Sequence, residues 1–242
     1  GVITKVTFRL YPRFAGTATL VISFDDRHAA IRAVPVILQT GVIPLALEYV
    51  DRDVIQISAD HLGMKWPARK GTAHLLVIIT GSNDEDVYEQ AGIVVKACEK
   101  LGVVDTVVAE TKEEQADILK IRSELYPVLK PRVADVLDMA IPPARIADFL
   151  DAVDEIGKKY GTRIITYGHA GDGNLHPHLP LELHERGILK AVKDDLYREA
   201  TKMGGVITAE HGVGKVRLKE VSLCVDEKQI ELMRGLKKLF DP

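Results

Sequence analysis

The sequence predicts an α+β fold built on an antiparallel sheet, with helices mainly on one face of that sheet. Short segments rich in β-branched residues alternate along the chain with longer segments of amphipathic helical period. The short segments are half polar, as in antiparallel sheets with one covered face, whereas parallel strands tend to be apolar on both faces. With 46% hydrophobic and 28% charged residues, the chain has the composition of a folded domain with a proper core.

The first predicted strand shows the alternation most clearly. Val2, Val6 and Leu10 lie on one side of an extended chain, while Lys5 and Arg9 lie on the other. The other strands are rich in β-branched and aromatic residues and are bounded by turn-forming residues. The predicted strands cover residues 2–10, 17–24, 45–50, 75–80, 103–109, 163–167 and 175–181, and residues 206–208 form a further short apolar run.

Capping residues mark the helices between these strands. Asp25 is predicted to cap a helix that runs to about Gln39 and is closed by Gly41. Pro35 falls inside that helix and should kink or split it. The other helices are expected over residues 53–62, from a cap at Asn83 or Asp84 to Leu101, from 112 to about 125, and from Pro142-Pro143 to Lys159.

Charge and cysteine content exclude several classes of protein. A formal net charge of −3 argues against a general nucleic-acid binder, which carries a basic stripe. Cys98 and Cys224 have the spacing of neither a disulfide framework nor a zinc knuckle. No apolar run reaches the roughly 18 residues of a transmembrane helix, and no signal-peptide pattern is visible. We therefore expect a cytoplasmic protein, with peripheral attachment to the inner face of the membrane as an alternative.

Two glycine-rich motifs concentrate the residues that can carry chemistry. Residues 170–174 form a turn between two predicted strands, so His169 and His176 lie at the two rims of a hairpin. Glu210 follows the apolar run of residues 206–208. Two histidines and one carboxylate, with coordination positions left open, suit a divalent metal such as Zn, Fe or Mn that must also meet a substrate. The motifs are Gly168-His169-Ala170-Gly171-Asp172-Gly173-Asn174-Leu175-His176 and Ala209-Glu210-His211-Gly212.

Two further histidines accompany these candidate ligands. His178 faces the same side as His176, because side chains alternate along a strand. His211 cannot readily bind the same ion as Glu210 if the backbone there is extended, so we expect it to act as a separate acid or base. Each piece alone could be ordinary turn chemistry, but half of the eight histidines gather here, which favours a functional site. We expect the others to be structural or surface residues, namely His28, His61, His74 and His184.

The paired motifs resemble those of the FAD-linked oxidase family. That family includes the flavin subunit of glycolate oxidase, flavin-dependent D-lactate dehydrogenases and D-2-hydroxyglutarate dehydrogenase. The resemblance implies that residues 1–242 are its C-terminal substrate or cap domain, with a ferredoxin-like sheet. FAD would then be held mainly by an FAD-binding domain absent from this chain, which has no dinucleotide or phosphate-binding motif. Further segments that recur in the family's order are Gly1-Val2-Ile3-Thr4-Lys5-Val6-Thr7, Phe24-Asp25-Asp26, residues 41–48, Ile121-Arg122-Ser123-Glu124 and Leu239-Phe240-Asp241-Pro242.

A hinge is predicted at residues 127–131, which contain two prolines. It would separate an N-terminal lobe of about residues 1–130 from a motif-bearing lobe of about residues 131–242.

The resemblance also assigns substrate-binding roles. Arg122 matches the family arginine that pairs with the carboxylate of a 2-hydroxy acid, and a guanidinium suits bidentate carboxylate binding. A surface ion pair with Glu124 or Asp117 is the alternative interpretation of Arg122. His178 stands where the D-2-hydroxyglutarate members have Asn, and their substrate lysine is missing from residues 136–139. Both departures favour glycolate, lactate or a related small hydroxy acid.

The resemblance implies oxidation of a 2-hydroxy acid to a 2-keto acid. A metal held by His169, His176 and Glu210 would bind the α-hydroxyl, and His211 would take its proton. Arg122 would orient the substrate while hydride passes to FAD. The isolated chain is expected to be inactive, and an iron–sulfur electron-transfer subunit is a candidate partner. Two other functions stay open: a metal-dependent hydrolase with His211 as its base, and a non-catalytic docking module for a flavin or iron–sulfur subunit.

Overall fold

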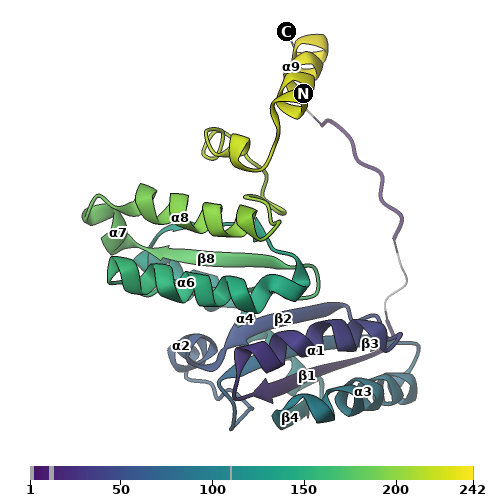
Figure 1. The fold of residues 1–242 in the computed structure, drawn as a ribbon. Helices are drawn as coiled ribbons and strands as arrows, with labels where there is room; N and C mark the ends of the chain where they lie inside the picture. Colours follow the sequence, from purple (N-terminus) through teal and green to yellow (C-terminus); the bar gives the residue numbers. More distant parts are fainter. Residues whose placement is uncertain (1–2, 11–13, 110, 242) are drawn as a thin grey trace.

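The computed structural model describes residues 3–10, 14–109 and 111–241. Within them, one sheet has the strand order β4-β1-β3-β2-β7-β8-β5, with β6 beside β8 (Figure 1). Every strand pair in it is antiparallel, which confirms the predicted sheet type. The strands are β1 (Gly16–Phe24), β2 (Ala46–Asp51), β3 (Ala73–Gly81), β4 (Val103–Ala109), β5 (Val133–Val136), β6 (Met139–Ala140), β7 (Ile165–His169) and β8 (Asn174–Pro180).

Helices connect these strands and cover the sheet. The longer ones follow the amphipathic segments of the sequence, and α8 and α9 are additional to those that the sequence analysis placed. The helices are α1 (Arg27–Gln39), α2 (Arg52–Leu62), α3 (Asp84–Cys98), α4 (Lys112–Ser123), α5 (Leu125–Leu129), α6 (Ile146–Tyr160), α7 (Leu181–Glu185), α8 (Leu189–Lys202) and α9 (Glu227–Phe240).

The sheet contains the same strand order twice. The order β4-β1-β3-β2, with α1 and α3 between its strands in sequence, is the ferredoxin-like arrangement that the family resemblance implied. The second unit repeats it: β7 pairs with β8, β8 with β6, and Val206 bridges Ala140 in β6. The predicted apolar run of residues 206–208 is thus reduced to a single bridge. The two units meet where β2 pairs with β7.

Two cores lie on opposite faces of the sheet, because neighbouring side chains of one strand point to opposite sides. In β1, Leu20 and Ile22 pack in the larger core with α1, α3, α6 and α8. Val21, between them, packs in the smaller core with α2, α4 and α5. Helices therefore cover both faces of the sheet, and the smaller set, on the second face, carries Arg122.

The predicted strand of residues 2–10 is wrong for the residues described. Residues 3–10 have no strand structure and run outside the body of the molecule (Figure 1). Ile3 and Phe8 are 83% and 77% exposed. The alternation of apolar side chains is present, but the described residues of this segment pair with no strand of the sheet. Val2 lies outside the described residues.

The helix boundaries need two corrections. Asp26, not Asp25, caps α1, because its carboxylate accepts from the backbone N–H groups of His28 and Ala29. Pro35 does not split the helix, which is continuous over Arg27–Gln39 with Val34 and its neighbours packed in the core. Asn83 caps α3 as predicted.

The residues of the predicted hinge form α5 and the short turn Lys130–Arg132, and the division into two lobes stays a prediction.

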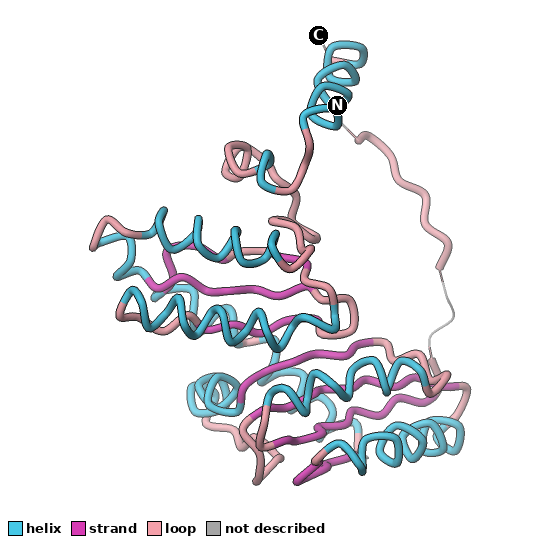
Figure 2. Tube along the Cα trace, in the orientation of Figure 1, coloured by secondary structure: helices cyan, strands magenta, loops and turns pink. Residues whose placement is uncertain are grey.

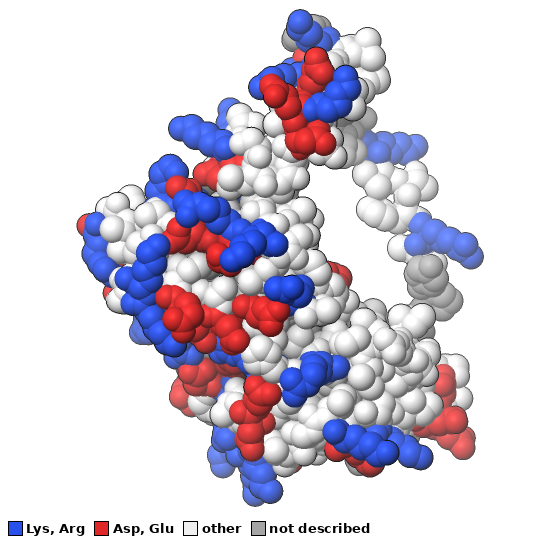
Figure 3. Space-filling view, in the orientation of Figure 1, with Lys and Arg blue, Asp and Glu red and all other residues white. Residues whose placement is uncertain are grey.

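The C-terminal part leaves the sheet after Val206. Residues 209–226 are mostly loop (Figure 2), and α9 has no buried side chain. On the face drawn in Figure 3, acidic and basic side chains are interspersed over α6 and α8. Among the described residues, no helix has the length and apolar character needed to cross a membrane.

Candidate active site

The hairpin between β7 and β8 holds the first motif in one conformation. Its turn is closed by a hydrogen bond from Gly173 N–H to the His169 carbonyl, at 3.0 Å. Gly173 has a φ of +83°, and a Cβ there would lie 1.9 Å from the Ile141 carbonyl oxygen, so only glycine fits. His169 and His176 flank this turn with ring centroids 5.5 Å apart, which confirms their predicted proximity.

Asp138 holds the second motif in a bend. Its side chain is fully buried, and Oδ2 accepts hydrogen bonds from Thr208 Oγ1 and from the backbone N–H groups of Ala209, Glu210 and His211, at 2.8–3.1 Å. The backbone here is therefore not extended, contrary to the assumption made from the sequence. Glu210 and His211 turn toward the same point, with Oε1 and Nε2 3.1 Å apart, so His211 is not kept away from the candidate ligand.

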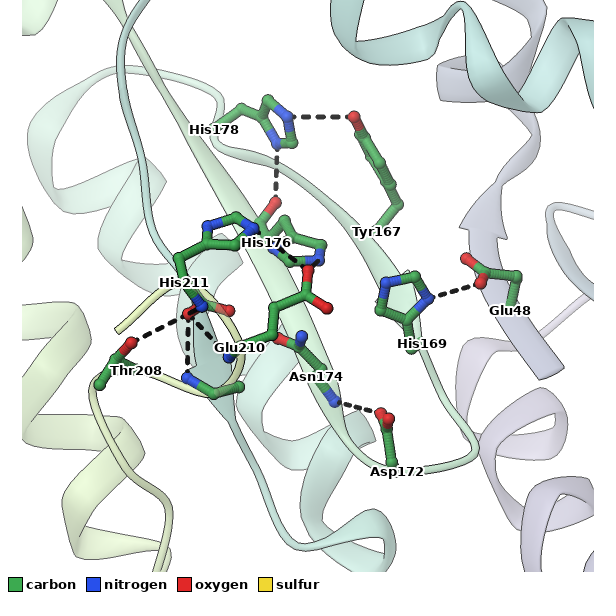
Figure 4. A network of polar contacts seen from close by, with 12 residues as sticks. Glu48, Tyr167, His169, Asp172, Asn174, His176, His178, Thr208, Glu210 and His211 are labelled. Atoms are coloured by element: carbon green, nitrogen blue, oxygen red, sulfur yellow. Dashed lines mark hydrogen bonds and ion pairs between the residues drawn. The ribbon is translucent and has the colours of Figure 1, made fainter. Parts of the chain in front are cut away.

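The bend brings Glu210 and His211 over His176 (Figure 4). The imidazole rings of His176 and His211 stack with centroids 5.6 Å apart, and Glu210 Oε1 lies 3.7 Å from His176 Nε2. One potential ligand atom from each of Asp138, His176, Glu210 and His211 lies within 4.8 Å of the others. The structure thus joins two of the predicted ligands, His176 and Glu210, with two groups that were not predicted as ligands.

His169 lies beside this cluster and is hydrogen-bonded to Glu48. The distance from His169 Nδ1 to Glu48 Oε1 is 2.5 Å. Arg122 reaches the same carboxylate from α4, with Nη2 2.6 Å from Glu48 Oε2. The alternative ion pair of Arg122 with Glu124 or Asp117 is not formed; Arg122 instead points into the site.

His178 forms a buried wall next to Arg122. Its ring stacks on Tyr167 with centroids 4.7 Å apart, and the Tyr167 hydroxyl lies 3.1 Å from Nε2. Nδ1 donates to the carbonyl oxygen of His176 at 2.7 Å. Burial lowers the pKa of His178 to about 4, so the ring is neutral at pH 7 and its Nε2 accepts from the tyrosine. The Arg122 guanidinium lies over the face of the Tyr167 ring, 5.0 Å from its centroid.

All six residues that the sequence analysis assigned to the site line one cavity of about 760 Å³. A slightly larger cavity, of about 810 Å³, opens around Arg27 and Asp51. Two of its charged groups are paired: Arg27 lies 2.7 Å from Asp154, and Asp51 accepts from Tyr49 at 2.6 Å. It contains none of the motif histidines, so we place the candidate site in the smaller cavity.

The surroundings of these groups shift their pKa values in different directions. Burial lowers the pKa of His176, and the neighbouring His169 lowers it further, so the His176 ring is neutral with a free lone pair. Burial alone would raise the pKa of Asp138, but the backbone N–H groups of His211 and Ala209 outweigh it and lower that pKa. The bond to a carboxylate raises the pKa of His169.

Two carboxylates of the site were missed at the sequence level. Glu48 is an isolated acid in the apolar segment of residues 45–50, and Asp138 is an isolated acid in the apolar run of residues 136–141. The signal that could have identified both carboxylates is an acidic residue inside a segment with the pattern of a buried strand. A buried charge needs a partner, so such a residue points to a polar site.

Comparison with known proteins shows the family and the fold of this chain. The family model described as FAD linked oxidases, C-terminal domain, matches residues 15–242. The chain belongs to this family. The likeness in fold extends to p-cresol methylhydroxylase, whose structure superposes with a TM-score of 0.71 at 16% identity, covering 97% of this chain and 52% of that one.

Two relatives illustrate the family's range. D-lactate dehydrogenase of Archaeoglobus fulgidus is 38% identical over 242 residues, which is 100% of this chain and 53% of the relative. Glycolate oxidase subunit GlcD of Bacillus subtilis is 28% identical over 248 residues, covering 100% of this chain and 52% of the relative. The chain spans about half the length of the curated relatives it matches.

Proposed function

We propose that this chain is the substrate-binding half of a flavin-dependent 2-hydroxy acid dehydrogenase or oxidase, acting on a glycolate or D-lactate type of substrate. The observation that carries the proposal is that Arg122 and the cluster of His176, Glu210 and His211 line one cavity. A 2-hydroxy acid carries a carboxylate and a hydroxyl on adjacent carbons, so its enzyme needs an anion-binding group close to a proton acceptor. The names of the relatives support this substrate class.

The site residues fit a divalent metal ion. Asp138 Oδ1 and His176 Nδ1 are buried without a hydrogen-bond partner in the described part of the chain, so donor atoms remain available to a cation. We propose His169, His176 and Glu210 as the ligands. His176 and Glu210 belong, with Asp138 and His211, to the group whose potential ligand atoms lie within 4.8 Å of one another, and the His169 ring lies 5.5 Å from the His176 ring. When bound, Zn, Fe or Mn supplies a Lewis acid that favours loss of the substrate's hydroxyl proton.

His211 is proposed to accept that proton. Its side chain is 52% exposed, compared with 10% for His176, so it can pass the proton on to solvent. Nε2 lies at the cavity, beside Glu210 Oε1. A positioned base of this kind contributes about 10²–10⁴-fold to the rate.

Arg122 and His178 are proposed to orient the substrate. The guanidinium of Arg122 binds the carboxylate, because its planar N–H groups match two carboxylate oxygens. The neutral ring of His178, held by Tyr167, forms the wall beside Arg122. Orientation by these groups directs the α-hydrogen of the substrate away from the base and toward the hydride acceptor.

The hydride acceptor is proposed to be FAD, which belongs to the family by name. Because the chain spans about half of its relatives, we propose that a further domain of the same protein holds most of the FAD. The Bacillus subtilis relative is named as a subunit, so we propose an electron-transfer subunit, of iron–sulfur type, as a partner.

Turnover by the full-length protein tests this proposal. The FAD-loaded protein is assayed with D-lactate, glycolate and D-2-hydroxyglutarate in the presence of an artificial electron acceptor. We expect His211→Ala to lower kcat by about 10²–10⁴-fold while the flavin content stays unchanged. His184→Ala, which alters an exposed histidine on α7, is the matched control and should retain wild-type turnover. Normal turnover by His211→Ala would remove the base assignment, and a loaded protein that oxidises none of the three acids would refute the function.

A further inference from the structure

Glu48 lies at the junction of the two ferredoxin-like units, directly opposite His169. The register of β2 and β7 pairs Glu48 with His169 and Tyr49 with Gly168. Side chains of directly paired residues project from the same face of a sheet. The Glu48 side chain is 10% exposed and is reached on this face by Arg122 of α4. One carboxylate therefore meets two groups of the proposed active site, which come from two other elements.

The two oxygens of Glu48 are divided between these partners. Oε1 is bonded to Nδ1 of His169 at 2.5 Å, and Oε2 accepts from Nε and Nη2 of Arg122 at 3.1 and 2.6 Å. An ionised carboxylate can only accept hydrogen bonds, so Nδ1 of His169 carries a proton. In the neutral ring, Nε2 must then hold the free lone pair. Figure 4 shows His169 between Glu48 on one side and His176 and Glu210 on the other.

We propose that Glu48 is a positioning residue that fixes His169 in the tautomer with Nε2 free to bind a metal, and that Arg122 makes a carboxylate indispensable at this position. The inference rests on the proposed function, because His169 is one of the proposed ligands. Arg122 can only donate, so it always occupies one acceptor atom of residue 48. Only a side chain with a second acceptor atom can also hold the Nδ1 proton of His169.

A glutamine at this position has one acceptor and one donor end, which makes the inference testable. In Glu48→Gln, Arg122 takes the amide oxygen and the amide N–H faces His169. Nδ1 must then accept, the proton moves to Nε2, and the atom that would bind the metal is blocked. If Arg122 is also removed, the amide can turn its oxygen toward His169 and restore the original tautomer. Removal of the Arg122 side chain is therefore expected to restore the metal binding that Glu48→Gln alone loses.

Calorimetric titration of the 242-residue chain with Zn²⁺ tests this expectation. We expect Glu48→Gln to weaken Zn²⁺ binding by about 10–100-fold, the range found for outer partners of ligating histidines. Arg122→Met should retain most of the affinity, and the double variant should bind nearly as well as Arg122→Met. Asp51→Asn removes a carboxylate from the same strand and is the matched control, with Zn²⁺ binding unchanged. Equal affinity of Glu48→Gln and wild type, or equal weakness of the single and double variants, would overturn the inference.

Direct observation of the His169 tautomer keeps the inference independent of metal binding. Two-bond ¹H–¹⁵N correlation spectra of the metal-free wild-type chain, at a pH where the ring is neutral, show whether Nδ1 or Nε2 of His169 carries the proton. A proton on Nδ1 supports the inference, and a proton on Nε2 overturns it. Failure of wild type to bind Zn²⁺ would count against the proposed metal ligands, while this spectrum would still decide the role of Glu48.

Discussion

Replacement of Asp138 by asparagine tests whether one buried carboxylate shapes the second motif. Oδ2 of this fully buried residue accepts four hydrogen bonds. Hydrogen bonds to a charged group contribute about 1.5–3 kcal/mol each, against about 0.5–1.5 kcal/mol for neutral pairs. The neutral amide oxygen would therefore lose about 1 kcal/mol per bond, or roughly 4 kcal/mol in all. Relief of a buried charge offsets part of this, so we expect Asp138→Asn to lower the free energy of unfolding by about 2–4 kcal/mol.

Urea unfolding followed by circular dichroism, with EDTA present, measures this loss. Thr208→Val removes one of the four donors to this charged group and should lower the free energy of unfolding by about 1.5–3 kcal/mol. Asp194→Asn removes an acid that is paired with Lys190 within α8, and should change it by less than about 0.5 kcal/mol. An Asp138→Asn variant within about 0.5 kcal/mol of wild type would refute the reasoning that the carboxylate holds the bend.

Two further predictions concern stability away from the ligand atoms. Burial, reinforced by the charge of Arg52, lowers the pKa of fully buried His74 to about 4 in the folded chain, with Asp105 opposing the shift. Its folded pKa lies below the unfolded value of about 6.5, so stability is complete above that pH and is lost as pH falls toward 4. Relative to His74→Asn, the wild-type free energy of unfolding should drop by about 3 kcal/mol between pH 7 and pH 4, and parallel pH profiles would contradict this. Gly173→Ala should cost about 3 kcal/mol or more in urea unfolding, because the new Cβ meets backbone. Gly161→Ala has a similar φ of +61° and open space around it, so it should cost only about 1 kcal/mol, and equal losses would show that the close contact does not matter.

Local signals in the sequence predicted most elements and the outline of the site. Residues 103–109 form β4 as expected, and Asn83 caps α3, because each depends on the residues of its own segment. The hairpin of His169 and His176 was predictable for the same reason: its turn residues and flanking strands are contiguous. The prediction of a strand over residues 3–10 failed because apolar alternation alone does not determine whether a segment pairs with the sheet, and Ile3 and Phe8 stay exposed.

The contacts that complete the site depend on residues far apart in the chain. Asp138 bonds a segment about seventy residues away, and Glu48 meets His169 only because β2 pairs with β7. No periodicity in the sequence shows which of the many acids will meet which turn. The bend at residues 209–211 depends on the hydrogen bonds to Asp138. The residues adjacent to Glu210 and His211 in the sequence therefore could not predict that the two side chains turn toward the same point.

The position of the site at the junction of the two units has a mechanical consequence. β2 and β7 pair over only two residues on each strand, whereas β1 and β3 pair along their whole length. Arg122 comes from the first unit and His169 from the second, and Glu48 binds both. The charge-assisted bonds of Glu48 therefore add to a short stretch of backbone pairing at the place where, in the proposed function, the substrate carboxylate and the metal would be held at a fixed distance. A substitution at Glu48 would then alter both the tautomer of His169 and the alignment of the two halves of the site. Removal of Arg122 as well can restore the tautomer but not the alignment, so rescue by a second substitution at Arg122 distinguishes the two effects.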